Sequence, residues 1–421
     1  MDVDSPTGPS GLHALARWFL PHASERQMHS TQSLLFTLLL PSLLQLPIGW
    51  HLLHYPQHRL PRLIMLPFVV LTAIRCGFSG HVEYTTQSWL NLDLGISAFF
   101  TSIRAIWLAT KTEAPKYIAN DGKPAQPLLL ELIGTMRFAG FDIGVPSASE
   151  PRWDFIVNRL ITSAWCYIGW DILDVAVKHP LVNPATHLGI GSLKICREGP
   201  LGLFAEALVF LSVGSIFVYL SIQGSCAFIS AISALFVPST QASWGDLPYI
   251  FPLKADSVRA LWSTHWHDLF RIMFLDLAFK PTASLARRLG LPRKAQKALG
   301  VLAVFTLSGL MHEAGIEGMS WGHADQGWGA GVEGWSYATT KFFVLQGVGV
   351  ILEDVLQETT GMKVQGWAGR IWAFTWVMGT GWPMIDVWLR HGIIPACPTS
   401  WQLSKPLVNA VLSALATWRT S

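Results

Sequence analysis

The sequence predicts an all-α integral membrane protein, a single bundle of about eight to ten transmembrane helices. Hydrophobic residues make up 51% of the 421 residues and charged residues only 14%, whereas soluble domains are about 25% charged. Twenty tryptophans and 22 phenylalanines indicate the same environment, because aromatic side chains collect in buried cores and at membrane interfaces. The composition therefore argues against a soluble enzyme, a disordered protein and a fibrous protein.

The chain is predicted to consist of a polar tail at residues 1–30 and one transmembrane domain at 31–421. The first ten residues are polar and acidic, so we expect no cleavable signal peptide. Targeting to a membrane, expected to be the endoplasmic reticulum, then depends on the first spanning helix. Apolar stretches that span or nearly span a bilayer are expected at residues 33–53, 61–78, 89–109, 155–177, 201–222, 226–237, 298–316, 341–355, 371–389 and 407–418.

The segments between the spans carry three further signals. Prolines at 41 and 47 predict kinks in the first span, and residues 111–154 are expected to form a long loop with a surface helix near 128–138. The residues between 280 and 297 include six basic side chains and no acidic one, which predicts a cytoplasmic loop. We take this cluster as an orientation signal, with attraction of coenzyme A phosphates as the alternative.

The net charge and the cysteines argue against several classes of partner. Thirty Lys and Arg against 27 Asp and Glu give a net charge of +3, too small to imply nucleic acid. The five cysteines are scattered, odd in number and without a C-x-x-C pair. We therefore expect neither a disulfide framework nor a zinc site.

A histidine near the end of an apolar run is the first candidate for function. A titratable group inside a membrane helix costs a few kcal/mol, so such a residue is a functional candidate by default. His312 follows an uncharged run that begins at Ala298. Fifteen residues at about 1.5 Å each would place it about 22 Å into a core of about 30 Å. Imidazole suits proton transfer near neutral pH, and Ser308 and Gly309 form a small surface that permits close approach of a helix or ligand.

The aromatic segment 265–271 is the second candidate. On a helix, His267 and Arg271 would share a face, whereas His265 would point nearly opposite to His267. One surface therefore cannot present both histidines, and no H-E-x-x-H pattern occurs, which argues against a metal centre. Packing of tryptophan and histidine at the membrane interface is the structural alternative for this segment.

Three acidic residues leave another class of enzyme open. Asp171 and Asp174 form a D-x-x-D pair, and Asp93 lies in a different apolar stretch. Membrane prenyltransferases hold diphosphate through Mg²⁺ on such acids, so a magnesium-dependent prenyltransferase or terpene cyclase is an alternative function. We expect the D-x-x-D pair to form an ion-pair network with Arg159 instead. A proton-relaying transporter is the weakest alternative, because no inverted repeat is apparent.

Two motifs within residues 244–313 resemble the signature of the wax-synthase-like branch of membrane-bound O-acyltransferases. The first motif comprises WGDLP at 244–248 and SVRALWSTHWH at 257–267, and the second is SGLMHE at 308–313. The separation of 45 positions between His267 and His312 suits that family, as does the basic segment between them. The sequence departs from the family at Leu261, where Phe is common, and at residues 264–265, where a basic pair is common.

The resemblance implies an acyl-CoA-dependent O-acyltransferase that acylates a hydrophobic alcohol within the lipid bilayer. In that family His312 would remove the proton from the acceptor hydroxyl, while His267 would orient the acceptor or donate to the oxyanion. Acyl-CoA, expected to be acetyl-CoA, would be a co-substrate and not a bound cofactor. The implied pocket residues are Trp262, Trp266, Asp268, Arg271, Ser308 and Glu313.

The resemblance also suggests a type of acceptor. Fungal terpenoid and meroterpenoid acetyltransferases share this branch, and the polar, proline-rich N-terminal half and the many tryptophans are similar to theirs. We therefore expect acetyl transfer to a terpenoid hydroxyl in secondary metabolism. A wax synthase that acts on long-chain alcohols is the alternative.

Overall fold

The computed structural model confirms an all-α integral membrane protein. It describes residues 11–22, 25–82, 89–118, 124–125, 128–146, 150–179, 202–236, 244–247, 254–319, 336–391, 393 and 400–420. Six helical segments in these ranges are long and apolar enough to cross a membrane: Thr31–His54, Leu60–Phe78, Trp89–Thr110, Arg152–Val177, Leu211–Phe236 and Arg293–Met319. The chain is therefore a multi-pass membrane protein.

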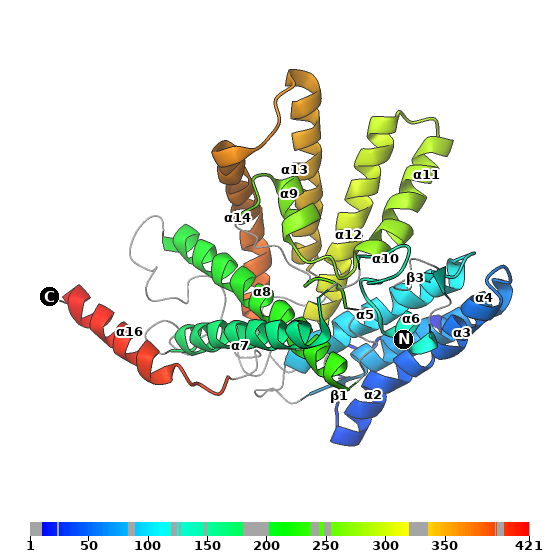
Figure 1. Ribbon diagram of the computed structural model, residues 1–421, viewed down its shortest axis with the longest axis horizontal. Helices are drawn as coiled ribbons and strands as arrows, with labels where there is room; N and C mark the ends of the chain where they lie inside the picture. The colour runs from blue at the N-terminus through cyan, green and yellow to red at the C-terminus, as the bar shows by residue number, and fades with distance from the viewer. Residues whose placement is uncertain are drawn as a thin grey trace, which may run out of the picture.

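The N-terminal helices pack together at one side of the molecule (Figure 1). The predicted first span is broken at Leu44 and Gln45, two residues before Pro47, as expected of a proline-associated kink, whereas the helix continues through Pro41. The elements of this part are α1 (Gly11–Phe19), α2 (Thr31–Leu43), α3 (Leu46–His54), α4 (Leu60–Phe78), α5 (Trp89–Thr110), and two small sheets, parallel β1 (Gln27–Met28) with β2 (Gly80–His81) and antiparallel β3 (Tyr117–Ile118) with β4 (Pro124–Ala125).

The middle of the chain supplies α6 (Leu129–Gly134), α7 (Arg152–Val177) and α8 (Gly202–Phe236). The two spans predicted at 201–222 and 226–237 are one continuous helix of 35 residues, because no proline or charged residue interrupts the sequence between them. The surface helix predicted near 128–138 corresponds to α6, and it is only partly exposed, since its residues Leu132 and Ile133 are buried. Helices α7 and α8 lie side by side (Figure 1).

The first signature motif folds into short, irregular helical pieces. These are α9 (Val258–Ala260), the π-helical turns η5 (Leu261–His265) and η6 (Leu275–Phe279), and α10 (Arg271–Phe274) between the two turns. The prediction that one helix carries His265, His267 and Arg271 is wrong. The backbone N–H of Trp266 donates to the carbonyl of Leu261 over 2.7 Å, and Trp266 itself is extended.

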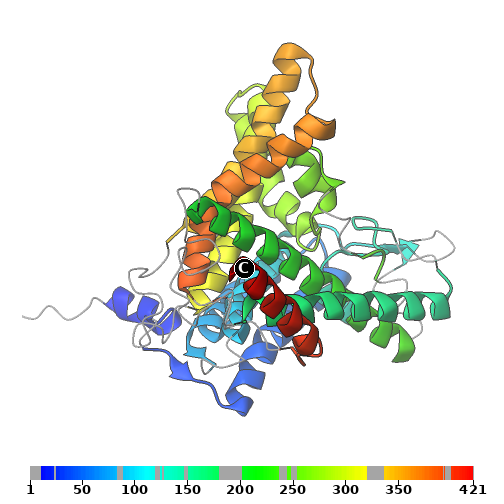
Figure 2. The ribbon, with the colours of Figure 1, turned by 90° about the vertical axis from the view of Figure 1, so that its left-hand side faces the viewer.

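Two helical hairpins project from the centre of the molecule (Figures 1 and 2). One consists of α11 (Lys280–Arg288) and α12 (Arg293–Met319), and the other of α13 (Ala338–Thr360) and α14 (Gly366–Arg390). The basic segment expected to be a loop is therefore mostly helical. Two of its lysines pair with α13, Lys294 with Glu358 and Lys297 with Asp354, each over 2.9 Å.

The D-x-x-D pair fastens the C-terminal helix α16 (Lys405–Thr420) to α7. Asp171 accepts hydrogen bonds from the backbone N–H groups of residues 403 and 404, and Asp174 accepts one from that of Ser400. Arg159 instead donates to the carbonyl of Gly245 over 2.8 Å. The predicted ion-pair network of Arg159 with the two aspartates is therefore wrong, because the carboxylates cap a helix.

Helix α12 crosses both α5 and α13 at glycines. A Cβ atom added to Gly309 would lie 2.6 Å from Cα of Thr340 on α13, and one added to Gly95 of α5 would meet the carbonyl oxygen of Ala314. Real Cβ atoms do not approach backbone atoms this closely, so larger residues at either position would separate the helices. The predicted small-residue surface at Gly309 thus serves helix packing.

We predict that Gly309→Ala destabilises the protein, whereas Gly379→Ala does not. Alanine favours a helix over glycine by about 1 kcal/mol, and nothing lies within 4 Å of a Cβ atom at Gly379. At Gly309 that gain is outweighed by overpacking, which costs about 1–3 kcal/mol. Thermal denaturation of the two variants in detergent measures the difference, and equal midpoints would contradict the close packing.

Candidate active site

A cavity of about 2170 Å³ lies between residues 261–270, which include the end of the first motif, and the helices α5, α7 and α8. Helices α12, α13 and α14 of the two hairpins also contribute to its lining. Pockets for drug-sized ligands have about 300–1,000 Å³, so this volume suits two large substrates or parts of them. The lining includes four of the predicted site residues, Trp262, Trp266, His267 and His312. Asp93 of α5 also lines it.

His312 is held in a defined orientation on α12. Its Nδ1 lies 2.7 Å from the carbonyl oxygen of Ser308, one turn earlier. A carbonyl only accepts hydrogen bonds, so Nδ1 carries the proton and Nε2 of the neutral ring presents a lone pair. The ring of Phe343 stacks on the imidazole with 4.5 Å between centroids and 27° between planes. These contacts fix both the tautomer and the plane of the ring.

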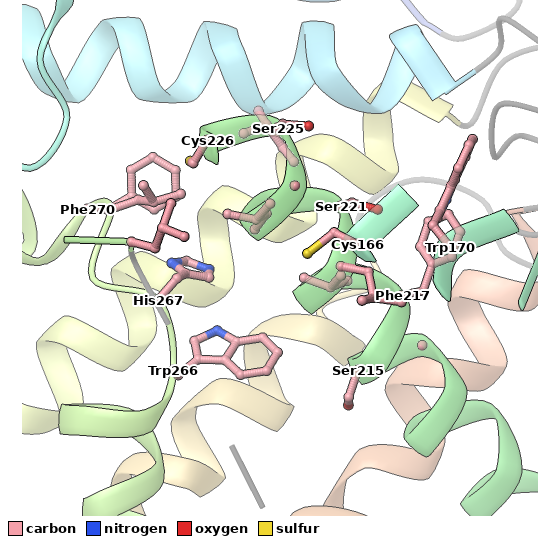
Figure 3. Close-up of a pocket in the computed structure, with 18 of the residues that line it drawn as sticks. Cys166, Trp170, Ser215, Phe217, Ser221, Ser225, Cys226, Trp266, His267 and Phe270 are labelled. Carbon is pink, nitrogen blue, oxygen red and sulfur yellow. The ribbon is translucent and has the colours of Figure 1, made fainter. Parts of the chain in front are cut away.

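His267 lies on the non-helical segment between η5 and α10. Its ring sits between those of Trp266 and Phe270, at centroid distances of 5.7 and 5.9 Å. Figure 3 shows it facing the cavity opposite Cys166 of α7 and Phe217 of α8. Both His267 and His312 line this cavity. The structure therefore brings together the two histidines of the two motifs, although they come from elements far apart in the sequence.

An aromatic wall connects the two motifs. The ring of Trp262 contacts those of Trp266, at 5.5 Å, and Phe343, at 5.6 Å. Since Phe343 also stacks on His312, it is the link between the tryptophans of the first motif and the histidine of the second. Sequence reasoning missed Phe343, because an apolar residue within a stretch predicted to span the membrane carries no distinguishing signal.

Four of the predicted pocket residues are absent from the described cavity lining. Asp268 forms an ion pair with Arg137, and Arg271 donates to the carbonyl of Ser263 over 3.1 Å. Ser308 contributes its main-chain oxygen to His312. These residues therefore hold the surroundings of the site, and they do not face its interior.

Glu313, the fourth of these residues, caps the start of α13. It is 1% exposed and accepts hydrogen bonds from the backbone N–H groups of Tyr337, over 2.6 Å, and Thr340, over 3.2 Å. The hydroxyl of Ser336 donates a third bond to it over 3.0 Å. Adjacent residues on α12 thus point in different directions, His312 into the cavity and Glu313 toward a helix end.

Residues 257–260, in the second part of the first motif, are also held by hydrogen bonds to a buried carboxylate. The carboxylate of Glu353 on α13 accepts hydrogen bonds from the backbone N–H groups of Val258, over 2.7 Å, and Arg259, over 3.0 Å. The Ser257 hydroxyl accepts a bond from the N–H of Ala260 over 2.9 Å. The serine and arginine of the motif therefore belong to a helix N-terminus and its attachment to α13 and not to the cavity.

The opposite wall of the cavity comes from α7 and α8, where the sequence offered only Asp171 and Asp174 as candidates, and Asp174 is part of the lining. Figure 3 shows small polar side chains and aromatic rings along it. Members of this wall are Cys166, Tyr167, Trp170, Ser215, Phe217, Ser221, Ser225 and Cys226. Within the described ranges, no group of three or more His, Cys, Asp or Glu side chains is arranged to hold a metal ion.

Comparisons with known proteins agree with the motifs. Residues 248–343, which contain both histidines, match the model of the membrane bound O-acyl transferase family. The chain is similar to acetyltransferase eriL of Hericium erinaceus, with 25% identity over 258 residues that cover 59% of this chain and 60% of that protein. It is also similar to acetyltransferase aurG of Calcarisporium arbuscula, with 24% identity over 257 residues, 56% of this chain and 58% of that protein.

A further relative is the O-Mevalon transferase yanI of Aspergillus niger, 24% identical over 297 residues that cover 63% of each chain. The match thus spans less than two thirds of the length of each of these relatives. No solved structure matches the chain. The comparisons confirm the resemblance to membrane-bound O-acyltransferases and to fungal acetyltransferases.

We predict that Glu313→Ala lowers stability by about 2 kcal/mol, since it removes a cap and leaves buried N–H groups without an acceptor. Glu313→Gln should cost less, because its amide oxygen still accepts. Glu358→Ala is the matched control on α13, where the carboxylate is exposed and pairs with Lys294. Thermal midpoints measured in detergent check this order, and an unaffected midpoint in Glu313→Ala would refute the capping role.

Proposed function

We propose that this protein is an acyl-CoA-dependent O-acyltransferase that esterifies a hydroxyl of a hydrophobic acceptor within the membrane. The observation that carries the proposal is the orientation of His312. Its proton is engaged by the Ser308 carbonyl and its free nitrogen is available in a large cavity shared with His267. Both histidines lie in the segment that matches the membrane bound O-acyl transferase family.

In the proposed reaction, Nε2 of His312 accepts the proton of the acceptor hydroxyl as its oxygen attacks the thioester carbonyl carbon. An N–H group of His267 donates to the oxyanion that develops on the carbonyl oxygen. When the tetrahedral intermediate collapses, the C–S bond breaks. The imidazolium of His312 then returns the proton to the departing thiolate, so that an ester and free coenzyme A leave. No covalent acyl-enzyme is required.

We further propose that the acyl group is acetyl and the acceptor a terpenoid or meroterpenoid alcohol. Two of the relatives described above are named acetyltransferases, and the cavity offers aromatic surfaces, among them Trp262, Trp266, Trp170 and Phe217, against which a large apolar skeleton can pack. A wax synthase is the second candidate within this class. We also propose that the protein resides in the membrane of the endoplasmic reticulum. Residues 31–421 would form one transmembrane domain, with residues 244–313 as its motif core.

We predict that His312→Gln lowers kcat for ester formation by about 10²–10⁴-fold, the usual contribution of a general base. His267→Ala should lower kcat by about 10²–10³-fold, as expected for loss of an oxyanion donor. The control is His391→Gln, because Nδ1 of His391 bonds the carbonyl of Val387 over 2.8 Å in the same way and the residue is absent from the described cavity lining. Turnover is measured with labelled acyl-CoA species of increasing chain length.

Full activity in folded His312→Gln would disprove the mechanism. Activity confined to long-chain acyl-CoA and long-chain alcohols would replace the acetyltransferase proposal with a wax synthase, while the roles of the histidines would stand.

We predict that the activity withstands chelation of divalent cations. The carboxylates of Asp171 and Asp174 already accept backbone hydrogen bonds from residues 400–404, so metal binding there would require these bonds to break. Ester formation is assayed with and without EDTA after removal of added Mg²⁺. Loss of ester formation on chelation, restored by Mg²⁺, would contradict this prediction. A Mg²⁺-dependent activity that persists in His312→Gln would favour the prenyltransferase or terpene cyclase.

A further inference from the structure

We infer that Arg137 is a positioning residue that holds His267 in place through Asp268. The inference rests on the proposed function, in which His267 donates to the oxyanion. Arg137 lies in the connection between α6 and α7, more than a hundred positions from His267 in the sequence. It belongs neither to the two motifs nor to the segment matched by the family model.

Arg137 and Asp268 form a close ion pair that contains one hydrogen bond. Nε of the guanidinium lies 2.5 Å from Oδ1 of Asp268, and Nη2 donates to Oδ2 over 2.9 Å. The side chains are 13% and 23% exposed. Contacts to both carboxylate oxygens, one of them a charge-assisted hydrogen bond, restrain the orientation of the carboxylate as well as its distance. Limited exposure to solvent also reduces the screening that makes surface ion pairs weak. Asp268 is therefore fixed in both position and direction.

The segment that carries His267 depends on this anchor more than a helical residue would. The helix ends at His265 and resumes at Arg271, so the regular hydrogen bonds of a helix do not set the backbone between them. Phe270 packs on Phe100 at a centroid distance of 5.1 Å and secures the far end of the segment. Asp268 directly follows His267, so a shift of the carboxylate moves the imidazole as well.

Arg137 is itself attached to a rigid part of the core. The next residue, Phe138, is 1% exposed and contacts the rings of Trp107 and Phe141 at 4.9 and 5.6 Å. Phe138 has a φ of 53°, a left-handed conformation that costs on the order of 1 kcal/mol or more for a residue other than glycine. The surrounding packing maintains this conformation, and Arg137 is thereby aimed at Asp268.

The same guanidinium also holds the start of the first motif. Nη1 of Arg137 donates to the carbonyl oxygen of Asp246, and Arg159 of α7 donates to that of Gly245. Arg137 thus joins the 244–247 segment to the segment of His267 at one point. The first part of the first motif, through Asp246, and the residue that directly follows its second part, Asp268, therefore share one external support.

A test in two backgrounds separates positioning from general structural support. We expect Arg137→Gln and Asp268→Asn each to lower kcat about 10- to 100-fold with little change in KM for acyl-CoA, as a misplaced catalytic group does. In a His267→Ala background, Arg137→Gln should lower the residual kcat no further, because the group it positions is gone. An equal loss in both backgrounds, or a higher KM with unchanged kcat, would overturn the inference.

A second measurement does not depend on activity. Diethyl pyrocarbonate modifies imidazole nitrogens, and the rate at His267 is followed by mass spectrometry with His312 as the internal reference. We expect Arg137→Gln and Asp268→Asn to change the rate at His267 at least several-fold, and Lys294→Gln, from the exposed pair with Glu358, to leave it unaltered. An unchanged rate in the first two variants would refute the positioning role.

The two failures remain distinguishable. If the wild-type chain forms no ester from any acyl-CoA, the proposed function falls, whereas the labelling experiment still decides whether Arg137 positions His267.

Discussion

The close crossing of α12 with α5 and α13 is the constraint on which the rest of the site depends. Gly309 allows the backbone of α13 to approach, and Gly95 allows α5 to pass close to the carbonyl of Ala314. His312 lies between these two crossings. Only at this separation does Phe343 reach the imidazole for stacking, and only then does Glu313 reach the first turn of α13. The geometry of the proposed base is therefore a consequence of two glycines.

Buried acids in this chain serve chiefly as caps for helices other than their own. Glu313 caps α13, Glu353 caps α9, and Asp171 accepts the N–H groups directly before α16. The first N–H groups of a helix have no partner within it, and an unsatisfied group costs several kcal/mol in a membrane. A carboxylate also interacts favourably with the positive end of the helix dipole. The position of these three buried carboxylates within apolar helices is thus explained by helix capping, without a role in catalysis.

This capping role also explains what could and could not be predicted from the sequence. The membrane class and most spans follow from apolar runs, and the break before Pro47 follows from proline chemistry. The interruption of the helix after His265 could not be predicted from the sequence. No proline or glycine marks it in residues 261–271, and tertiary contacts set the break. Arg137 and Phe343 were missed for the same reason: each acts on a residue distant in sequence, and no local periodicity encodes such a contact.

The two histidines are held by different kinds of restraint, and the proposed chemistry calls for that difference. A general base needs one fixed tautomer, and the carbonyl of Ser308, part of a regular helix, provides it for His312. An oxyanion donor must instead lie where charge develops during the reaction. Had the helix continued from η5 to Arg271, helical periodicity would fix the direction of side chain 267. Because the helix stops at His265, the direction of His267 is set by contacts with neighbouring side chains. We propose that the ion pair of Asp268 with Arg137 is the contact that holds it.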